Sequence, residues 1–151
     1  MTLKERLEED MKTAMKEREA GRERLSVIRL ARTAVKYSEI DKMHALSDDE
    51  VLTVLAKEIK QRQDAIPEYV KAGRTETVEL LGREIAILRA YMPEQMSEEE
   101  VRRICRETIE QVGAKDQKDM GKVMGALMPK VRGKADGRLV NQIVKELLTA
   151  S

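Results

Sequence analysis

The sequence predicts an all-α protein, with an N-terminal helical bundle followed by a small C-terminal three-helix bundle. Phe and Trp are absent and Tyr occurs three times, whereas sheet proteins favour aromatic and β-branched residues. Charged residues make up 38% of the 151 residues, and Leu, Ile, Val, Ala and Met supply nearly all the apolar surface. Apolar positions recur with helical periodicity along most of the chain, which argues against disorder.

Two helices and a short polar connection are predicted at the N-terminus. The first covers residues 3–19 and stops at Gly21, and the second covers residues 23–41. Because the connection is short, the pair is expected to form an antiparallel hairpin. The apolar stripes consist of Leu3, Leu7, Met11 and Met15 in the first helix, and of Leu25, Ile28, Ala31, Ala34 and Val35 in the second.

A third helix is predicted to start at Ser47, because Ser47 and Glu50 have the spacing of a capping box. Pro67 lies inside its apolar pattern and is expected to kink the helix or to end it near Ala65. Gly73 marks a stop, and a fourth helix is predicted at about residues 76–91. The apolar stripe of the third helix consists of Val51, Leu55, Ile59, Ile66 and Val70.

The segment 92–96, which contains Pro93, is the best candidate for a boundary, and it divides the chain into subdomains 1–93 and 94–151. Ser97 and Glu100 form a second capping-box pattern, and the helix that follows ends at Gly113. Two further helices are predicted at about 117–128 and 137–149, the latter with Asp136 as its N-cap. Three amphipathic helices in this span favour a small three-helix bundle.

No pattern indicates catalysis, and no catalytic residue, metal ligand, cofactor or small-molecule substrate is expected. His44 is the sole histidine and has no nucleophile near it in sequence, so it is interpreted as a solvated loop residue. Cys105, the only cysteine, falls on an apolar helical stripe and is interpreted as a buried structural thiol. Neither a signal peptide nor a membrane-spanning apolar stretch is visible, so a cytoplasmic protein without a membrane contact is expected.

Charge is unevenly distributed, although the net charge is only +1. Residues 1–93 carry eighteen charges of each sign, whereas Lys115 to Lys145 include eight Lys/Arg against three Asp. Within this basic stretch, Gly121 and Gly125 lie one helical turn apart beside an apolar arc. Because Gly costs about 1 kcal/mol in a helix interior, two such residues suggest a face that something approaches closely. The approaching group could be a packed helix or a phosphate backbone, and the sequence leaves both possibilities open.

The loop 130–138 favours the phosphate interpretation. It brings four cations and two glycines to a helix start, where free N–H groups attract anions. Because no aromatic residue is near, base stacking is not expected, and shape or phosphate recognition of folded RNA is the remaining mode. The candidate RNA-binding residues are Lys118, Gly121, Lys122, Gly125, Lys130, Arg132, Lys134 and Arg138.

The same residues resemble the signature of the YqeY family, most specifically in DMGKVMG at 119–125 and GKADGRLVN at 133–141. Upstream matches are EIK at 58–60, KAGR at 71–74, LRAYMP at 88–93 and SEEE at 97–100. Pro67 departs from what is usually a continuous helix in this family.

The resemblance implies an all-α fold in two helical parts. It also implies kinship with the tail domain of the B subunit of glutamyl/aspartyl-tRNA amidotransferase, which contacts tRNA while other domains carry the chemistry. It thus favours a role in tRNA binding or in association with a tRNA-amidotransferase complex, without catalytic activity of the chain's own. The alternative is a protein-interaction module whose glycine face docks a partner helix.

Overall fold

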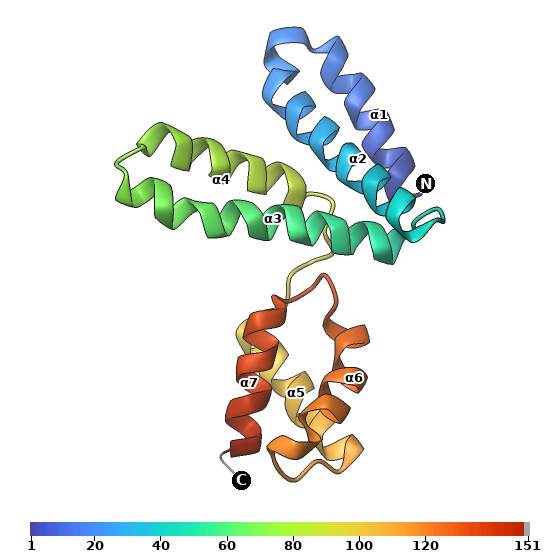
Figure 1. Ribbon diagram of the computed structural model, residues 1–151, viewed down its shortest axis with the longest axis vertical. Coiled ribbons are helices and arrows are strands. Elements are labelled where there is room, and N and C mark those ends of the chain that lie inside the picture. The colour runs from blue at the N-terminus through green and yellow to red at the C-terminus, as the bar shows by residue number, and fades with distance from the viewer. Residues whose placement is uncertain (150–151) are drawn as a thin grey trace. The chain divides into compact units, whose positions relative to one another are not determined.

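The computed structural model describes residues 1–149 and contains seven α-helices, two short 3-10 helices and no strand in that range (Figure 1). The all-α prediction is confirmed. The chain divides between Met92 and Pro93 into two compact units, which we call the N-terminal and C-terminal units. Residues 91–97 are not helical, as expected for a break at Pro93.

The N-terminal unit consists of two helical hairpins. In the first, α1 (Leu3–Lys16) is followed by the 3-10 helix η1 (Arg18–Gly21) and then by α2 (Arg22–Lys42), which returns antiparallel to α1 (Figure 1). In the second, α3 (Asp48–Lys71) pairs with α4 (Thr75–Arg89). One core joins the four helices, and its fully buried large side chains include Leu7, Ile28, Val51, Leu55 and Leu88.

The apolar stripe of α1 shifts near its end relative to the prediction. Leu7 is buried and Leu3 and Met11 pack on the core, but Met15 is 49% exposed and Ala14 is fully buried in its place. Gly21 lies against the backbone of Ala14, so the chain reverses over this residue rather than over Met15.

Pro67 does not end α3, so the predicted stop near Ala65 is wrong, while the alternative of a kink stays a prediction. The helix continues to Lys71. A proline inside a helix removes one hydrogen bond and costs about 3 kcal/mol. The helix pairs with α4 along the hairpin, where Arg62 bonds both Glu58 at 3.0 Å and Glu84 of α4 at 2.9 Å.

The helix starts follow their predicted caps. Ser47 Oγ accepts from the Glu50 N–H while the Glu50 carboxylate accepts from the Ser47 N–H, so the capping box of α3 is confirmed. At α5, the Glu100 N–H donates to Ser97 Oγ at 3.2 Å, but no return bond runs from the Ser97 N–H to the Glu100 carboxylate, so only half of the second predicted capping box is present. At the end of α4, the buried Tyr91 donates its hydroxyl to Asp10 of α1.

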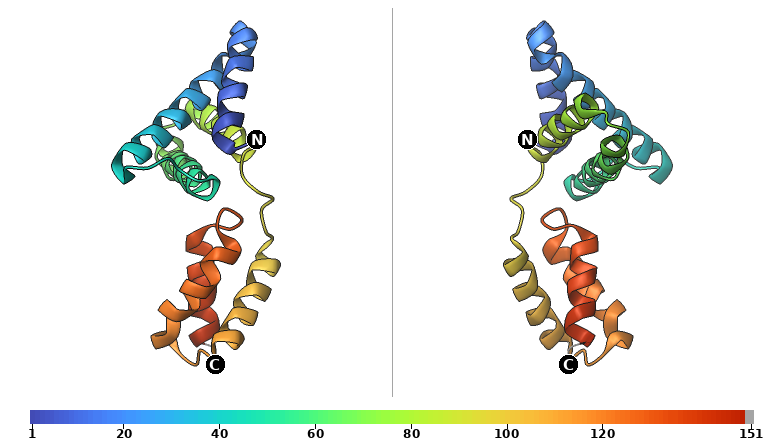
Figure 2. Two further views of the ribbon diagram at one scale, coloured as in Figure 1. Left: turned by 90° about the vertical axis from the view of Figure 1, so that its right-hand side faces the viewer. Right: turned by 90° about the vertical axis from the view of Figure 1, so that its left-hand side faces the viewer.

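The C-terminal unit packs α5 (Glu98–Val112), α6 (Met120–Val131) and α7 (Gly137–Thr149) around their own core (Figure 2). Gly113 ends α5 with φ +68°, as predicted. The predicted helix at 117–128 differs, because Asp116 caps a 3-10 turn, η2 (Gln117–Asp119), and α6 then extends through Pro129 to the buried Val131. The core consists of Val101, Cys105, Val123, Leu127, Val131, Val140, Ile143, Val144 and Leu148.

Candidate nucleic-acid interface in the C-terminal unit

The two glycines of α6 lie on an exposed face of the helix, on which nothing from the described part of the chain packs. A Cβ built on Gly121 or on Gly125 would meet no atom within 4 Å. These glycines therefore do not serve close packing between helices of this chain within residues 1–149. The open face remains available to an outside group.

Pro129 lies one turn further along the same side of α6, because it lies four residues after Gly125, as Gly125 lies four after Gly121. Proline has no N–H, so residue 129 cannot give the Gly125 carbonyl its usual helical hydrogen bond. The main chain is therefore accessible at the two glycines, and the Gly125 carbonyl oxygen lacks the N–H donor that it would have in a regular helix.

The candidate cations divide into two groups at the ends of α6. Lys118 in η2 and Lys122 lie near the start of α6, whereas Lys130 and the loop after it lie near its end. From Lys122 to Lys130 the axial distance is about 12 Å at the rise of an α-helix. All six predicted cations are exposed. The exposed cations therefore lie toward both ends of α6, and the two glycines lie between them along the helix axis.

Lys130 is held by α5 rather than extended into solvent. Its Nζ donates to Gln111 Oε1 at 2.9 Å and to Thr108 Oγ1 at 3.2 Å. Thr108 is fully buried, and its hydroxyl in turn donates to the Ile104 carbonyl at 2.8 Å. An ammonium has three N–H groups, so one remains for an anion after these two bonds.

The basic loop between α6 and α7 is fixed by the segment that precedes α5. The Gln95 side chain donates to the Gly133 carbonyl at 2.8 Å, and the Met96 N–H donates to the Lys134 carbonyl at 2.9 Å. Gly133 has φ +75°, a left-handed conformation that glycine adopts without strain. These two bonds fix the backbone at Gly133 and Lys134, directly after Arg132.

The start of α7 is less open to an anion than the sequence suggested. Asp136 is its cap as predicted, and the Asp136 Oδ1 accepts from the Arg138 N–H at 3.0 Å. A carboxylate therefore already occupies one of the N–H groups that a phosphate would need. Arg138 adds an exposed cation to this helix start.

The supporting residues Gln95, Thr108 and Gln111 were not identified from the sequence. Each is a neutral polar residue, and their partners are 38, 22 and 19 positions away along the chain. No local pattern indicates such bonds, since they depend on how α5, α6 and the preceding segment come together.

Neither the single histidine nor the single cysteine belongs to a catalytic or metal-binding cluster in the described residues. The exposed His44 lies in the loop after α2, where its Nε2 is 3.7 Å from the Glu50 carboxylate. Cys105 is fully buried, and burial raises the pKa of its thiol. Across residues 1–149 no three metal-binding side chains gather, and no helix has both the length and the hydropathy to cross a bilayer.

A comparison with protein-family models matches residues 4–148 to the Yqey-like proteins. The chain belongs to the YqeY family. This match covers both units and confirms the resemblance drawn from the motifs at 119–125 and 133–141.

Similar proteins include amidotransferase subunits and proteins named as mitochondrial. Over 46 residues the chain is 50% identical to the E subunit of glutamyl-tRNA(Gln) amidotransferase from Thermococcus sibiricus, covering 30% of this chain and 7% of that protein. Over 148 residues it is 25% identical to altered inheritance of mitochondria protein 41, mitochondrial, of Pyrenophora tritici-repentis, covering 96% of this chain and 80% of that protein. The Kluyveromyces lactis protein of the same name is 40% identical over 86 residues, or 56% of this chain and 45% of that protein.

The chain spans less than a tenth of the amidotransferase subunits that it matches. Two of the relatives are named as mitochondrial proteins, so the cytoplasmic location expected from the sequence stays a prediction.

Proposed function

We propose that this chain is a non-catalytic tRNA-binding protein that acts in association with a tRNA-dependent amidotransferase. Phosphates of the tRNA would contact Lys118, Lys122, Lys130, Arg132, Lys134 and Arg138, and its backbone would approach the main chain at Gly121 and Gly125. The observation that supports this most directly is the open glycine face of α6, which has exposed cations at both of its ends.

Two further observations support the proposal. The local excess of cations within 115–145 matches the electrostatic footprint of a phosphate-binding surface. Kinship to a component of a glutamyl-tRNA(Gln) amidotransferase supplies the context of tRNA. Folded RNA fits better than a single strand, because residues 93–151 include no aromatic side chain to stack on bases.

The second candidate function is docking of a partner protein's helix on the same face. It is favoured by the free space above Gly121 and Gly125, and by Met124 and Met128, which are only partly buried beside that face. The two functions differ in their response to salt, because phosphate contacts release counterions and apolar contacts do not.

A titration of fluorescently labelled, unfractionated tRNA at several salt concentrations tests the proposal. Lys122→Glu combined with Lys134→Glu should weaken binding strongly, and each lost phosphate contact should lower the log–log salt slope by about one. Lys57→Glu with Lys60→Glu is the matched control, since it makes the same charge change at exposed positions on α3. Undetectable binding at low salt, or equal binding by the C-terminal variant and the control, would favour the protein-docking function.

Gly125→Ala separates the role of the glycine from that of charge. Because a Cβ at this position meets nothing within 4 Å, the substitution should raise the free energy of unfolding by up to about 1 kcal/mol through helix propensity. Its tRNA affinity should nevertheless fall, since a methyl group would hold the RNA away from the main chain. Unchanged affinity in the stabilised variant would remove the glycine face from the binding surface.

A further inference from the structure

The outward face of α2 carries large apolar side chains that the core does not use. Leu30, Tyr37 and Ile40 are 53%, 69% and 66% exposed. On an ideal helix these three positions fall within an arc of about 80°. The opposite side of α2 is fully buried at Val27, Ile28 and Ala31. The helix is therefore apolar on two faces, of which the fold covers one.

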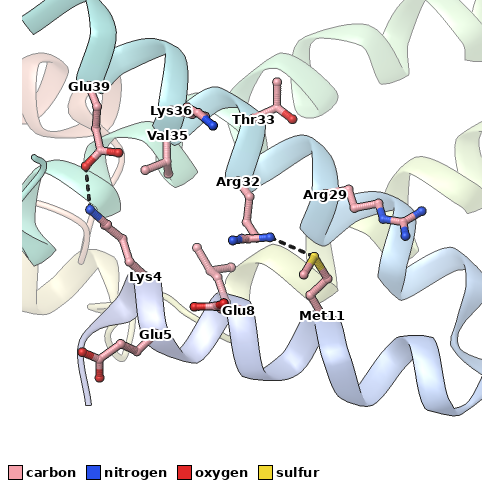
Figure 3. Close-up of a pocket in the computed structure, with 11 residues that line it drawn as sticks. Lys4, Glu5, Glu8, Met11, Arg29, Arg32, Thr33, Val35, Lys36 and Glu39 are labelled. Atoms are coloured by element: carbon pink, nitrogen blue, oxygen red, sulfur yellow. Dashed lines mark hydrogen bonds and ion pairs between the residues drawn. The ribbon is translucent and has the colours of Figure 1, made fainter.

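A groove lies beside this apolar strip, and a smaller hollow includes Leu30 itself. A groove of about 600 Å³ lies between α1 and α2, and its lining includes Met11, the buried Leu7 and Val35, and the carboxylates of Glu5, Glu8 and Glu39 (Figure 3). A smaller hollow of about 350 Å³ lies further toward the start of α2, between Leu25, Arg29 and Leu30. Hollows of this kind accept protruding side chains of a second helix, as ridges enter grooves in helix packing.

A row of cations follows the apolar strip at heptad spacing. Arg22, Arg29 and Lys36 are exposed, and none has a carboxylate within ion-pair distance in the described part of the chain. Other cations of the unit, such as Lys4 with Glu39 and Arg83 with Glu23, are paired.

Arg32 adds a donor inside the groove. Its guanidinium extends from α2 toward α1 and bonds the Met11 sulfur at 2.9 Å (Figure 3). A thioether is a weak acceptor, so the guanidinium retains capacity for an incoming carboxylate.

We propose that this face of α2 binds an acidic amphipathic helix of a partner protein. Its apolar side chains pack on Leu30, Tyr37 and Ile40, and its carboxylates pair with Arg22, Arg29 and Lys36. This surface lies in the N-terminal unit and is separate from the glycine face of the C-terminal unit.

Other occupants fit the face less well. A nucleic acid would neutralise the cations but would leave Leu30 and Ile40 without apolar contacts. A second copy docked by a two-fold axis would place the same cations opposite one another. A lipid surface would meet Ser26 and Thr33 between the apolar residues as well as the two hollows.

The probes for the test are three fluorescein-labelled helical peptides of 18 or so residues, enough for about five turns. The first has Leu at the a and d positions and Glu at e and g, the second has Lys in place of Glu, and the third keeps Glu but has Ser in place of Leu. Anisotropy titrations use the full-length protein. The first peptide should bind saturably, and the other two should bind at least tenfold more weakly.

Charge reversal then assigns the binding to α2. Arg29→Glu with Lys36→Glu should weaken the acidic peptide at least tenfold and strengthen the Lys peptide, whereas Lys57→Glu with Lys60→Glu should change neither. Leu30→Ser with Tyr37→Ser should weaken the acidic peptide similarly. Circular dichroism should show unchanged helix content, since all these side chains are exposed.

Three results would overturn the proposal: no saturable binding of the acidic peptide at millimolar concentration, equal affinity for the Lys peptide, or loss of affinity in the α3 control as well. Phosphatidylserine vesicles or tRNA that bound through Arg29 and Lys36, in place of the peptide, would assign the face to a membrane or to RNA instead. Because Lys122→Glu with Lys134→Glu leaves α2 intact, failure here is distinguishable from failure of the proposed tRNA binding.

Discussion

Among individual residues, Gly21 is the glycine whose missing side chain matters for packing. A Cβ built there would stand 2.2 Å from the Ala14 carbonyl oxygen, closer than real atoms approach. By contrast, a Cβ on Gly82 in α4 would meet nothing within 4 Å. The sequence suggested a close contact at Gly121 and Gly125, but no other part of the described chain approaches them. The close backbone contact is instead between Gly21 and Ala14, at the turn between α1 and α2.

Gly21→Ala should destabilise the protein by about 1–3 kcal/mol, because the added methyl group must push backbone against backbone. Gly82→Ala is the matched control and should raise the free energy of unfolding by up to about 1 kcal/mol through helix propensity. Urea unfolding followed by circular dichroism measures both. Equal stability of the Gly21 variant and the wild type would show that the turn relaxes at no cost.

Cys105 should react slowly with a thiol reagent in the native protein. Its side chain is fully buried in the core of the C-terminal unit. Burial raises the pKa of the thiol, so little thiolate is present near neutral pH. Labelling followed by absorbance should be slow in buffer and rapid in denaturant. Rapid stoichiometric labelling under native conditions would contradict the burial.

At the level of helices, the junction between α2 and α3 depends on Glu50. Its carboxylate closes the capping box with Ser47 and pairs with Lys42 at the end of α2, at 3.1 Å. The backbone hydrogen bond from Ser47, followed by the bond from Lys42, lowers the pKa of Glu50 from 4.5 to about 2. One side chain therefore stabilises the start of one helix and holds the end of another.

The lowered pKa of Glu50 predicts a dependence of stability on pH. Because the carboxylate is favoured in the folded state, its contribution is complete above the unfolded-state pKa of 4.5 and is lost as the pH falls toward 2. Glu50→Gln should therefore be less stable than the wild type at pH 6, and the difference should shrink by pH 3. Urea midpoints at both pH values measure this. A constant difference would show that the ionised carboxylate contributes nothing.

For the molecule as a whole, each of the two units has a hydrophobic core built from its own residues. The C-terminal core is drawn from α5, α6 and α7 and the N-terminal core from residues before Pro93. The structure divides the chain between Met92 and Pro93. The division into a helical subdomain 1–93 and a three-helix subdomain 94–151 stays a prediction.

A fragment of residues 94–151 should fold on its own, because nine buried residues form a core contained within it. A domain this short buries a smaller fraction of its surface than a larger one, so its stability should be modest. Circular dichroism of the fragment should show helix and a cooperative thermal transition. A featureless melt without helix would mean that this part needs residues 1–93.

Local signals in the sequence were sufficient for the fold class and for most helix ends. Ser47, Gly113 and Asp136 act through neighbours within four residues, so their effects can be read without knowledge of the tertiary structure. The family could likewise be identified from contiguous motifs. The structure shows that the candidate RNA-binding residues lie in η2, in α6, in the loop after it and at the start of α7. That they bind RNA stays a prediction.

Only the tertiary structure decided the features that depend on contacts between distant segments. Arg62 of α3 bonds Glu84 of α4, Met15 is exposed because the chain reverses over Ala14, and Lys130 is held by α5. The exposure of one face of α2 also depends on the tertiary structure. Helical periodicity shows which residues share a face, but not whether another element covers that face. Local propensity and capping act over one turn of helix, whereas burial is a property of the assembled bundle.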